Sequence, residues 1–103
     1  MDQANTEQAP ELGPEIRAQM VEVLRKHGVT HAGLLGFFAR SAEDTAGELE
    51  VLIDPPRNMT LLGLAALEND LEDLLGLPVN PVSIGGLRPS ERENALSKQE
   101  ALF

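Results

Sequence analysis

The sequence predicts an α/β fold, close to the border with α+β, in which helices cover a small mixed sheet of about three or more strands. Apolar residues recur at helical spacing in two segments, 14–27 and 61–75. Short apolar runs bounded by glycine or proline separate and follow these segments. With 103 residues and 42% hydrophobic content, the chain is long enough for one core and too short for two.

A single domain is expected over residues 14–98. Residues 1–13 are polar and acidic, and they offer too little apolar surface to offset the entropy of ordering. They are therefore expected to form a flexible acidic tail, and residues 99–103 a C-terminal tail. Pro14 fits the first position of a helix, which Gly28 would stop.

Three short segments are candidates for strands. Ala32–Leu35 is apolar and is followed by Gly36, which predicts a buried strand that ends there. Residues 49–53 predict a second strand, which the following Asp-Pro-Pro would stop because consecutive prolines cannot continue a ladder. Residues 79–84 form a third candidate, and the proline within it predicts an edge position or a bulge.

Two further helices are predicted. Thr60 is a plausible N-cap for a wide apolar stripe that runs to Leu75, and Gly76 follows as a stop. Near the end of the chain, Ser90 and Glu93 have the spacing of a capping box, which predicts a short helix through about residue 97.

The charge and cysteine content exclude several classes of function. Seventeen acidic residues against eight basic ones give a net charge of −9, which repels nucleic-acid phosphates and favours a protein partner with a basic surface. The chain has no Trp or Tyr to stack on bases and no Cys for disulfides or thiolate metal sites. No apolar run approaches the roughly 20 residues of a membrane span. We therefore expect a cytoplasmic protein with neither a nucleic-acid nor a membrane partner.

Two segments next to the predicted strands carry a family resemblance. The first is Gly36-Phe37-Phe38-Ala39-Arg40-Ser41, and the second is Gly47-Glu48-Leu49-Glu50-Val51-Leu52-Ile53. Together with 54–62 and 76–80, they resemble the minimal nucleotidyltransferases, with a likeness that spans about residues 16 to 96. The resemblance implies the polymerase-beta-like nucleotidyltransferase fold. Several members of that family act as antitoxins paired with HEPN-domain toxins.

The resemblance also implies a degenerate metal site. In active members the second strand opens with Asp-x-Asp, whose aspartates share one strand face and bind catalytic metal with a third carboxylate from the next strand. This chain has Glu48 and Glu50 at the two aspartate positions and Asn80 at the third. Glutamate is one methylene longer than aspartate, whereas Mg²⁺ demands near-octahedral ligands at about 2.0–2.1 Å. Without the family pattern, the two glutamates would simply be the solvent face of a strand.

The implied nucleotide-binding residues are Gly36, Phe37, Arg40 and Ser41. Phe37 stands where active members have a serine that donates to a phosphate, so its ring would fill that space, although an ordinary core role explains it equally well. Ser41 replaces a glycine.

These substitutions leave alternative functions open. The favoured hypothesis is a catalytically degenerate protein that acts by binding a HEPN-like toxin and needs no cofactor. The alternative is an active nucleotidyltransferase that transfers AMP from ATP to a protein, with Mg²⁺ or Mn²⁺ held by Glu48 and Glu50. A variant with no remaining role, kept only as a fold, is a third possibility. The sequence leaves the oligomeric state open.

Overall fold

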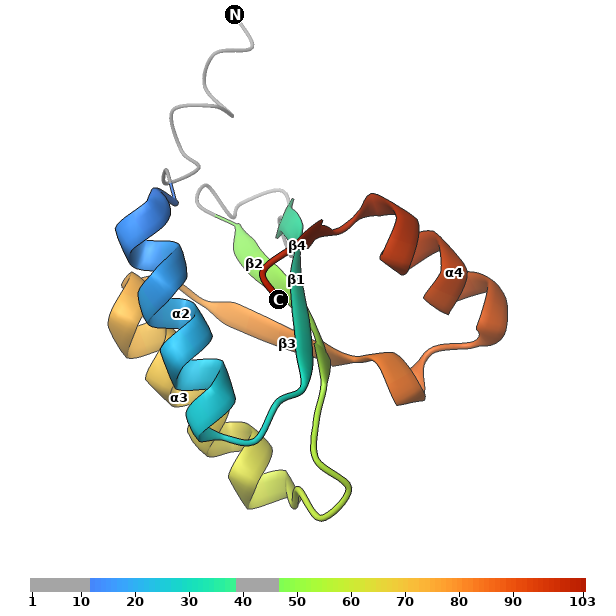
Figure 1. Cartoon of the computed structure of the whole chain (residues 1–103), viewed down its shortest axis with the longest axis horizontal. Helices are drawn as coiled ribbons and strands as arrows, with labels where there is room; N and C mark the ends of the chain where they lie inside the picture. The colour runs from blue at the N-terminus through green and yellow to red at the C-terminus, as the bar shows by residue number, and fades with distance from the viewer. Residues whose placement is uncertain (1–11, 39–46) are drawn as a thin grey trace, which may run out of the picture.

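The computed structural model describes residues 12–38 and 47–103 of the chain, as one layer of helices, a sheet and a further helix (Figure 1). No helix in these two ranges is long and apolar enough to cross a membrane. The elements in chain order are α2 (Pro14–Lys26), β1 (His31–Phe38), β2 (Glu48–Asp54), α3 (Leu61–Leu75), β3 (Val79–Ser83), the 3₁₀ turn η1 (Ile84–Gly86), α4 (Pro89–Lys98) and β4 (Glu100–Ala101).

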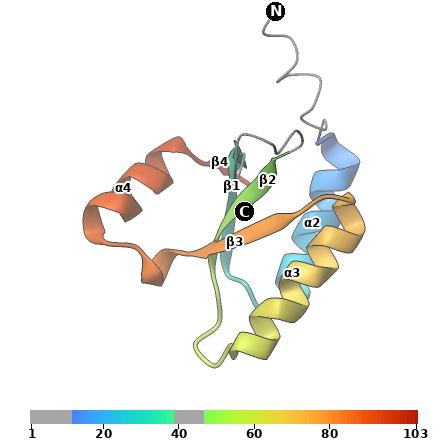
Figure 2. The same ribbon diagram turned by 180° about the vertical axis from the view of Figure 1, so that it is seen from behind.

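The four strands form one mixed sheet in the order β3-β2-β1-β4. β2 and β3 are parallel, whereas β1 runs antiparallel to both β2 and β4. Helices α2 and α3 lie together on one side of the sheet and α4 lies on the other, as the two opposite views agree (Figures 1 and 2). The prediction of a small mixed sheet covered by helices is confirmed, and β3 is an edge strand as its proline predicted.

The core lies between the sheet and the pair α2 and α3. Alternate residues of a strand point to the same face, and Leu49, Val51 and Ile53 of β2 are buried in one cluster with the helices. The helix side of that cluster consists of fully buried side chains, namely Met20, Leu24, Leu67 and Leu71.

Helix α3 begins and ends where the sequence predicts. The Thr60 hydroxyl accepts a hydrogen bond from the Gly63 amide at 3.0 Å, which satisfies one of the free N–H groups of the first turn. Gly76 ends the helix with φ of 72°, a left-handed conformation that favours glycine.

The start of α4 differs from the prediction. The helix begins at Pro89, and the Glu91 carboxylate accepts a hydrogen bond from the backbone N–H of Arg88 at 3.0 Å. The predicted capping box of Ser90 and Glu93 is therefore wrong. Proline suits the first helical position because its missing N–H would have no partner there.

The segment 99–103 pairs with the sheet instead of trailing from it. Gly33 lies opposite Ala101, and Leu34 opposite Glu100. Beyond β4, the Ala32 carbonyl accepts from the Leu102 amide at 2.8 Å. This strand could not be predicted from alternating apolar and polar residues, because only two of its residues pair with β1.

Two cationic side chains of α2 also hold the end of the chain. Arg17 makes a salt bridge to Glu100 at 2.8 Å, and the Arg25 guanidinium lies 4.6 Å from the centroid of the Phe103 ring. The C-terminal segment thus connects α4 to the helix layer on the other side of the sheet.

A substitution at Gly33 tests the packing of the C-terminal segment against β1. A Cβ at Gly33 would overlap the side chain of Gln99, whose Oε1 lies 3.1 Å from Nε2 of His31. We expect Gly33→Ala to lower the free energy of unfolding by about 1–2 kcal/mol, measured by urea denaturation. Gly86→Ala is the matched control, since a Cβ there would meet nothing within 4 Å. In a Gln99→Ala background the cost should fall by at least half; an unchanged cost would contradict this account.

Candidate active site

The parallel pairing of β2 and β3 sets two of the predicted site residues side by side. Glu50 is the register partner of Asn80, and the Asn80 amide Nδ2 donates a hydrogen bond to Oε2 of Glu50 at 3.2 Å. Both side chains are half-buried. Thus the structure brings together residues 50 and 80, which are 30 positions apart in the chain.

Glu48 lies two residues before Glu50, on the same face of β2. It is half-buried and is the register partner of Phe38 at the end of β1. Leu52, the next residue on this face, is fully buried. The face of β2 that carries the two glutamates is therefore shielded from water at Leu52 and more open toward Glu48.

The described residues do not form a carboxylate cluster suited to catalytic metal. Within 12–38 and 47–103, no group of three or more His, Cys, Asp or Glu side chains could hold a metal ion. At the position where a third carboxylate would complete such a cluster, Asn80 presents an N–H donor to Glu50. That donor and a divalent cation would compete for the same carboxylate oxygen.

Gly36 lies next to Glu50 because of a bulge in β1. Leu34 pairs with Val51 and Gly36 with Glu50, so Leu35 is left between the two pairs. Gly36 has φ of 129°, which only glycine adopts readily. The prediction that Gly36 ends the strand is wrong. Pairing with β2 resumes at Gly36 after the bulge, and β1 continues to Phe38.

The other predicted nucleotide-binding residues are less fully placed. Phe37 lies in β1 opposite Leu49, next to Gly36. Arg40 and Ser41 lie outside the described residues, so their predicted role is not tested.

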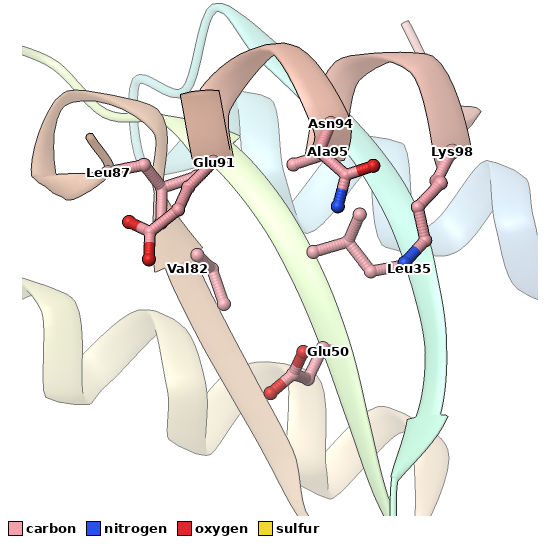
Figure 3. Close-up of a pocket in the computed structure, with 8 residues that line it drawn as sticks. All are labelled: Leu35, Glu50, Val82, Leu87, Glu91, Asn94, Ala95 and Lys98. Carbon is pink, nitrogen blue, oxygen red and sulfur yellow. The ribbon is translucent and has the colours of Figure 1, made fainter. Parts of the chain in front are cut away.

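A cavity of about 310 Å³ lies between α4 and the sheet, with Glu50 on its floor (Figure 3). The volume is near the lower end of the range of small-molecule sites. The strands contribute Leu35, Glu50 and Val82, and the side chains of α4 and its preceding loop face them from above: Leu87, Glu91, Asn94, Ala95 and Lys98.

Most of the residues that line this cavity were not predicted from the sequence. Val82 could have been found, since it lies two residues after Asn80 and therefore on the same face of β3. The position of Lys98 over the cavity could not be predicted from the sequence. Helix α4 has no buried residue, so no apolar stripe indicates which of its sides faces the sheet. Of the described residues that line this cavity, Lys98 is the one with a cationic side chain.

Arg92 forms a hydrogen bond with Leu87, one of the residues that line the cavity. Its Nη2 donates to the carbonyl of Leu87 at 3.2 Å, whereas its buried Nε has no hydrogen-bond partner within 12–38 and 47–103. Glu91 is similarly engaged in the start of α4. Among the described lining residues, the floor of the cavity therefore presents the Glu50 carboxylate and the roof presents the Glu91 carboxylate and the Lys98 ammonium group, which can bind polar groups of either charge.

Comparisons with known proteins identify the family. No protein-family model matches the chain. A protein of Methanocaldococcus jannaschii, provisionally named a protein adenylyltransferase, is 27% identical over 84 residues, which are 82% of this chain and 90% of that protein. A second protein of that organism with the same provisional name is 32% identical over 74 residues, which are 64% of this chain and 76% of the relative.

A solved structure agrees with these relatives. It is described, provisionally, as a minimal nucleotidyltransferase, and it matches with a TM-score of 0.68 and 32% identity over 81% of this chain and 85% of its own. The chain belongs to the minimal nucleotidyltransferase family. The resemblance found in the sequence is thereby confirmed.

Two other structures share the nucleotidyltransferase fold at low identity. One is described as the toxin-antitoxin MntA-HepT, with a TM-score of 0.68 and 11% identity over 88% of this chain. The other is described as a mutant of that toxin-antitoxin with two aspartate-to-glutamate substitutions two positions apart, with a TM-score of 0.68 and 13% identity over 84% of this chain.

The contact of Asn80 with Glu50 can be tested by restoring a carboxylate. Asn80→Asp would set two negative groups side by side on neighbouring strands, which should cost about 0.5–1 kcal/mol of stability without metal. Adding ~10 mM Mn²⁺ should then raise the Tm of the variant by about 5 °C, because the ion would bind only the folded site. Differential scanning fluorimetry measures both effects.

Asn69→Asp is the matched control for this variant. It adds the same charge at an exposed position of α3, on the other side of the sheet. Its Tm should not depend on Mn²⁺. If the unmodified protein gains as much from Mn²⁺ as Asn80→Asp does, then the amide does not limit cation binding and the account of this site is wrong.

Proposed function

We propose that this minimal nucleotidyltransferase is catalytically degenerate and acts by binding a protein partner, as the antitoxin of a HEPN-like toxin. The observation that carries the proposal is the hydrogen bond from the Asn80 amide to the Glu50 carboxylate. It occupies the position at which the family pattern requires a metal-binding carboxylate.

The loss of catalysis follows from ligand chemistry. An amide carries no negative charge and cannot accept a proton at neutral pH, so Asn80 can serve neither as a strong metal ligand nor as a base. Glu48 and Glu50 keep their charge, but each extra methylene displaces a carboxylate within a site where a 1 Å error costs roughly 10²-fold in rate. Together these changes favour a protein that has kept the scaffold and lost the transfer reaction.

The antitoxin role is supported by the structural neighbours. Two of them are described as toxin–antitoxin complexes, and one of these carries paired aspartate-to-glutamate substitutions. Glu48 and Glu50 have the same residue type and the same spacing. Paired glutamates are therefore compatible with such an assembly, and the net charge of −9 favours a partner with a basic surface.

An active enzyme is the second candidate, and a specific observation favours it. Glu48 and Glu50 share one face of β2, and Glu50 reaches a cavity into which Lys98 also projects (Figure 3). The provisional name of the archaeal relatives is protein adenylyltransferase. In this case Mg²⁺ or Mn²⁺ with ATP would be required, and the two glutamates would do the work of aspartates.

Partner capture followed by a labelling assay separates the two candidates. We expect a HEPN-like chain to co-purify with the tagged protein from its native host, and Glu50→Gln to bind that chain with an unchanged Kd. Purified complex given radiolabelled ATP with Mg²⁺ or Mn²⁺ should show no transfer of AMP to the partner. If the partner is labelled with AMP, and the Glu50→Gln variant does not label it, then the protein is an active nucleotidyltransferase instead.

A restored variant supplies the positive control. The substitutions Phe37→Ser, Glu48→Asp, Glu50→Asp and Asn80→Asp together rebuild the residue types of the active family pattern. Metal-dependent nucleotide binding by this variant would show that the assay detects a competent site. Failure to find any HEPN-like chain would overturn the antitoxin role and leave the assignment of the degenerate site standing.

A further inference from the structure

The outward side of α3 carries an apolar surface that the fold leaves uncovered. Leu61 and Leu62 are 85% and 83% exposed, which makes them the most exposed large apolar side chains of the described residues. Ala65 and Ala66 are also exposed and lie one turn further along. We call these four residues the α3 outer face. Leu67 and Leu71 of the same helix are buried in the core, so these exposed residues face away from it. The cavity over Glu50 lies under α4, which is on the other side of the sheet from α3 (Figures 1 and 2).

The apolar surface continues beyond the helix. A hollow of about 450 Å³ opens beside its N-terminus. Its lining is partly apolar, with Pro55, Pro56, Met59, Leu61 and Leu64, and partly polar, with Asp54, Arg57, Thr60 and Ser83. Contiguous exposed apolar surface of this kind marks interaction sites in soluble proteins. The two exposed leucines can project from one copy, and the apolar part of the hollow can receive such a side chain.

The charge around this surface identifies its occupant. The stretch from Pro55 to Leu67 contains no acidic residue, although the chain has 17 among its 103 residues, and its one charged residue is Arg57. The exposed Asp54, which also lines the hollow, lies three residues before Arg57 and offsets its charge. Further along α3, Asp70 is turned toward α2, where its Oδ2 lies 2.7 Å from Nε2 of His27. A basic partner would therefore find little attraction here, while two copies of this acidic chain would meet with the least repulsion.

We infer that the α3 outer face binds the same face of a second copy of this chain, with the two helices antiparallel. Antiparallel packing brings the exposed Arg57 of each copy toward the exposed Asp73 near the far end of the other helix. Parallel packing would bring Arg57 toward Arg57. The small side chains of Ala65 and Ala66 let two helices approach closely, and the contact is self-complementary, as a twofold dimer requires. The inference does not depend on the proposed function.

Sedimentation velocity over a concentration series tests this inference. The 11.1 kDa chain should associate to twice its mass with a Kd on the order of 10 μM, as expected of a small interface. Leu61→Asp should weaken the dimer by about 100-fold, because it places a charge within the apolar contact. A negative group in the first turn suits a helix N-terminus, so the variant should keep its circular dichroism spectrum. Leu96→Asp, at the exposed leucine of α4, should leave the Kd unchanged.

A second pair of variants tests the orientation of the helices. Arg57→Glu should weaken the dimer by about 10-fold, because it would face the acidic end of α3 in the other copy. Arg88→Glu makes the same change of net charge at an exposed site outside the contact and should have little effect. A protein that stays monomeric at millimolar concentration, or a dimer that Leu61→Asp does not weaken, would overturn the inference. Equal effects of Arg57→Glu and Arg88→Glu would overturn the antiparallel arrangement.

Discussion

The parallel register of β2 and β3 is the constraint on which both the core and the candidate site depend. It places Glu50 beside Asn80 on one face of the sheet, and the same alternation turns Leu49, Val51 and Ile53 toward the helices. A slip of one residue would move the glutamates into the core and the apolar side chains out of it. The burial of the core therefore fixes the chemistry of the opposite face.

That chemistry depends on a single functional group. Between two strands in this register, a carboxylate at residue 80 would create a region of concentrated negative charge that calls for a cation. An amide satisfies Glu50 directly by donating to it at 3.2 Å. Under the proposed function, this hydrogen bond would stand in for a bound cation beside Glu50. The α3 outer face and the cavity over Glu50 also lie apart, since α3 and α4 are on opposite sides of the sheet (Figure 2).

The sequence predicted those parts of the fold that depend on neighbouring residues. Helix α3 was found with its cap and its stop because Thr60 and Gly76 act within one turn of the helix ends. The bulge at Leu35, the strand β4 and the cavity beneath α4 were missed, because each depends on residues distant in the chain. The meeting of Glu50 with Asn80 was predicted only through the family resemblance, since spacing within the chain carries no information on which strands pair.

Calorimetric titration of the protein with ATP and Mn²⁺ tests the central claim most directly, because nucleotide held through metal is what an intact site would bind. The account predicts no heat of binding beyond dilution at ligand concentrations up to about 1 mM, whether Glu50 is present or replaced by glutamine. Tight binding of ATP that requires Mn²⁺ and is lost in Glu50→Gln would contradict it.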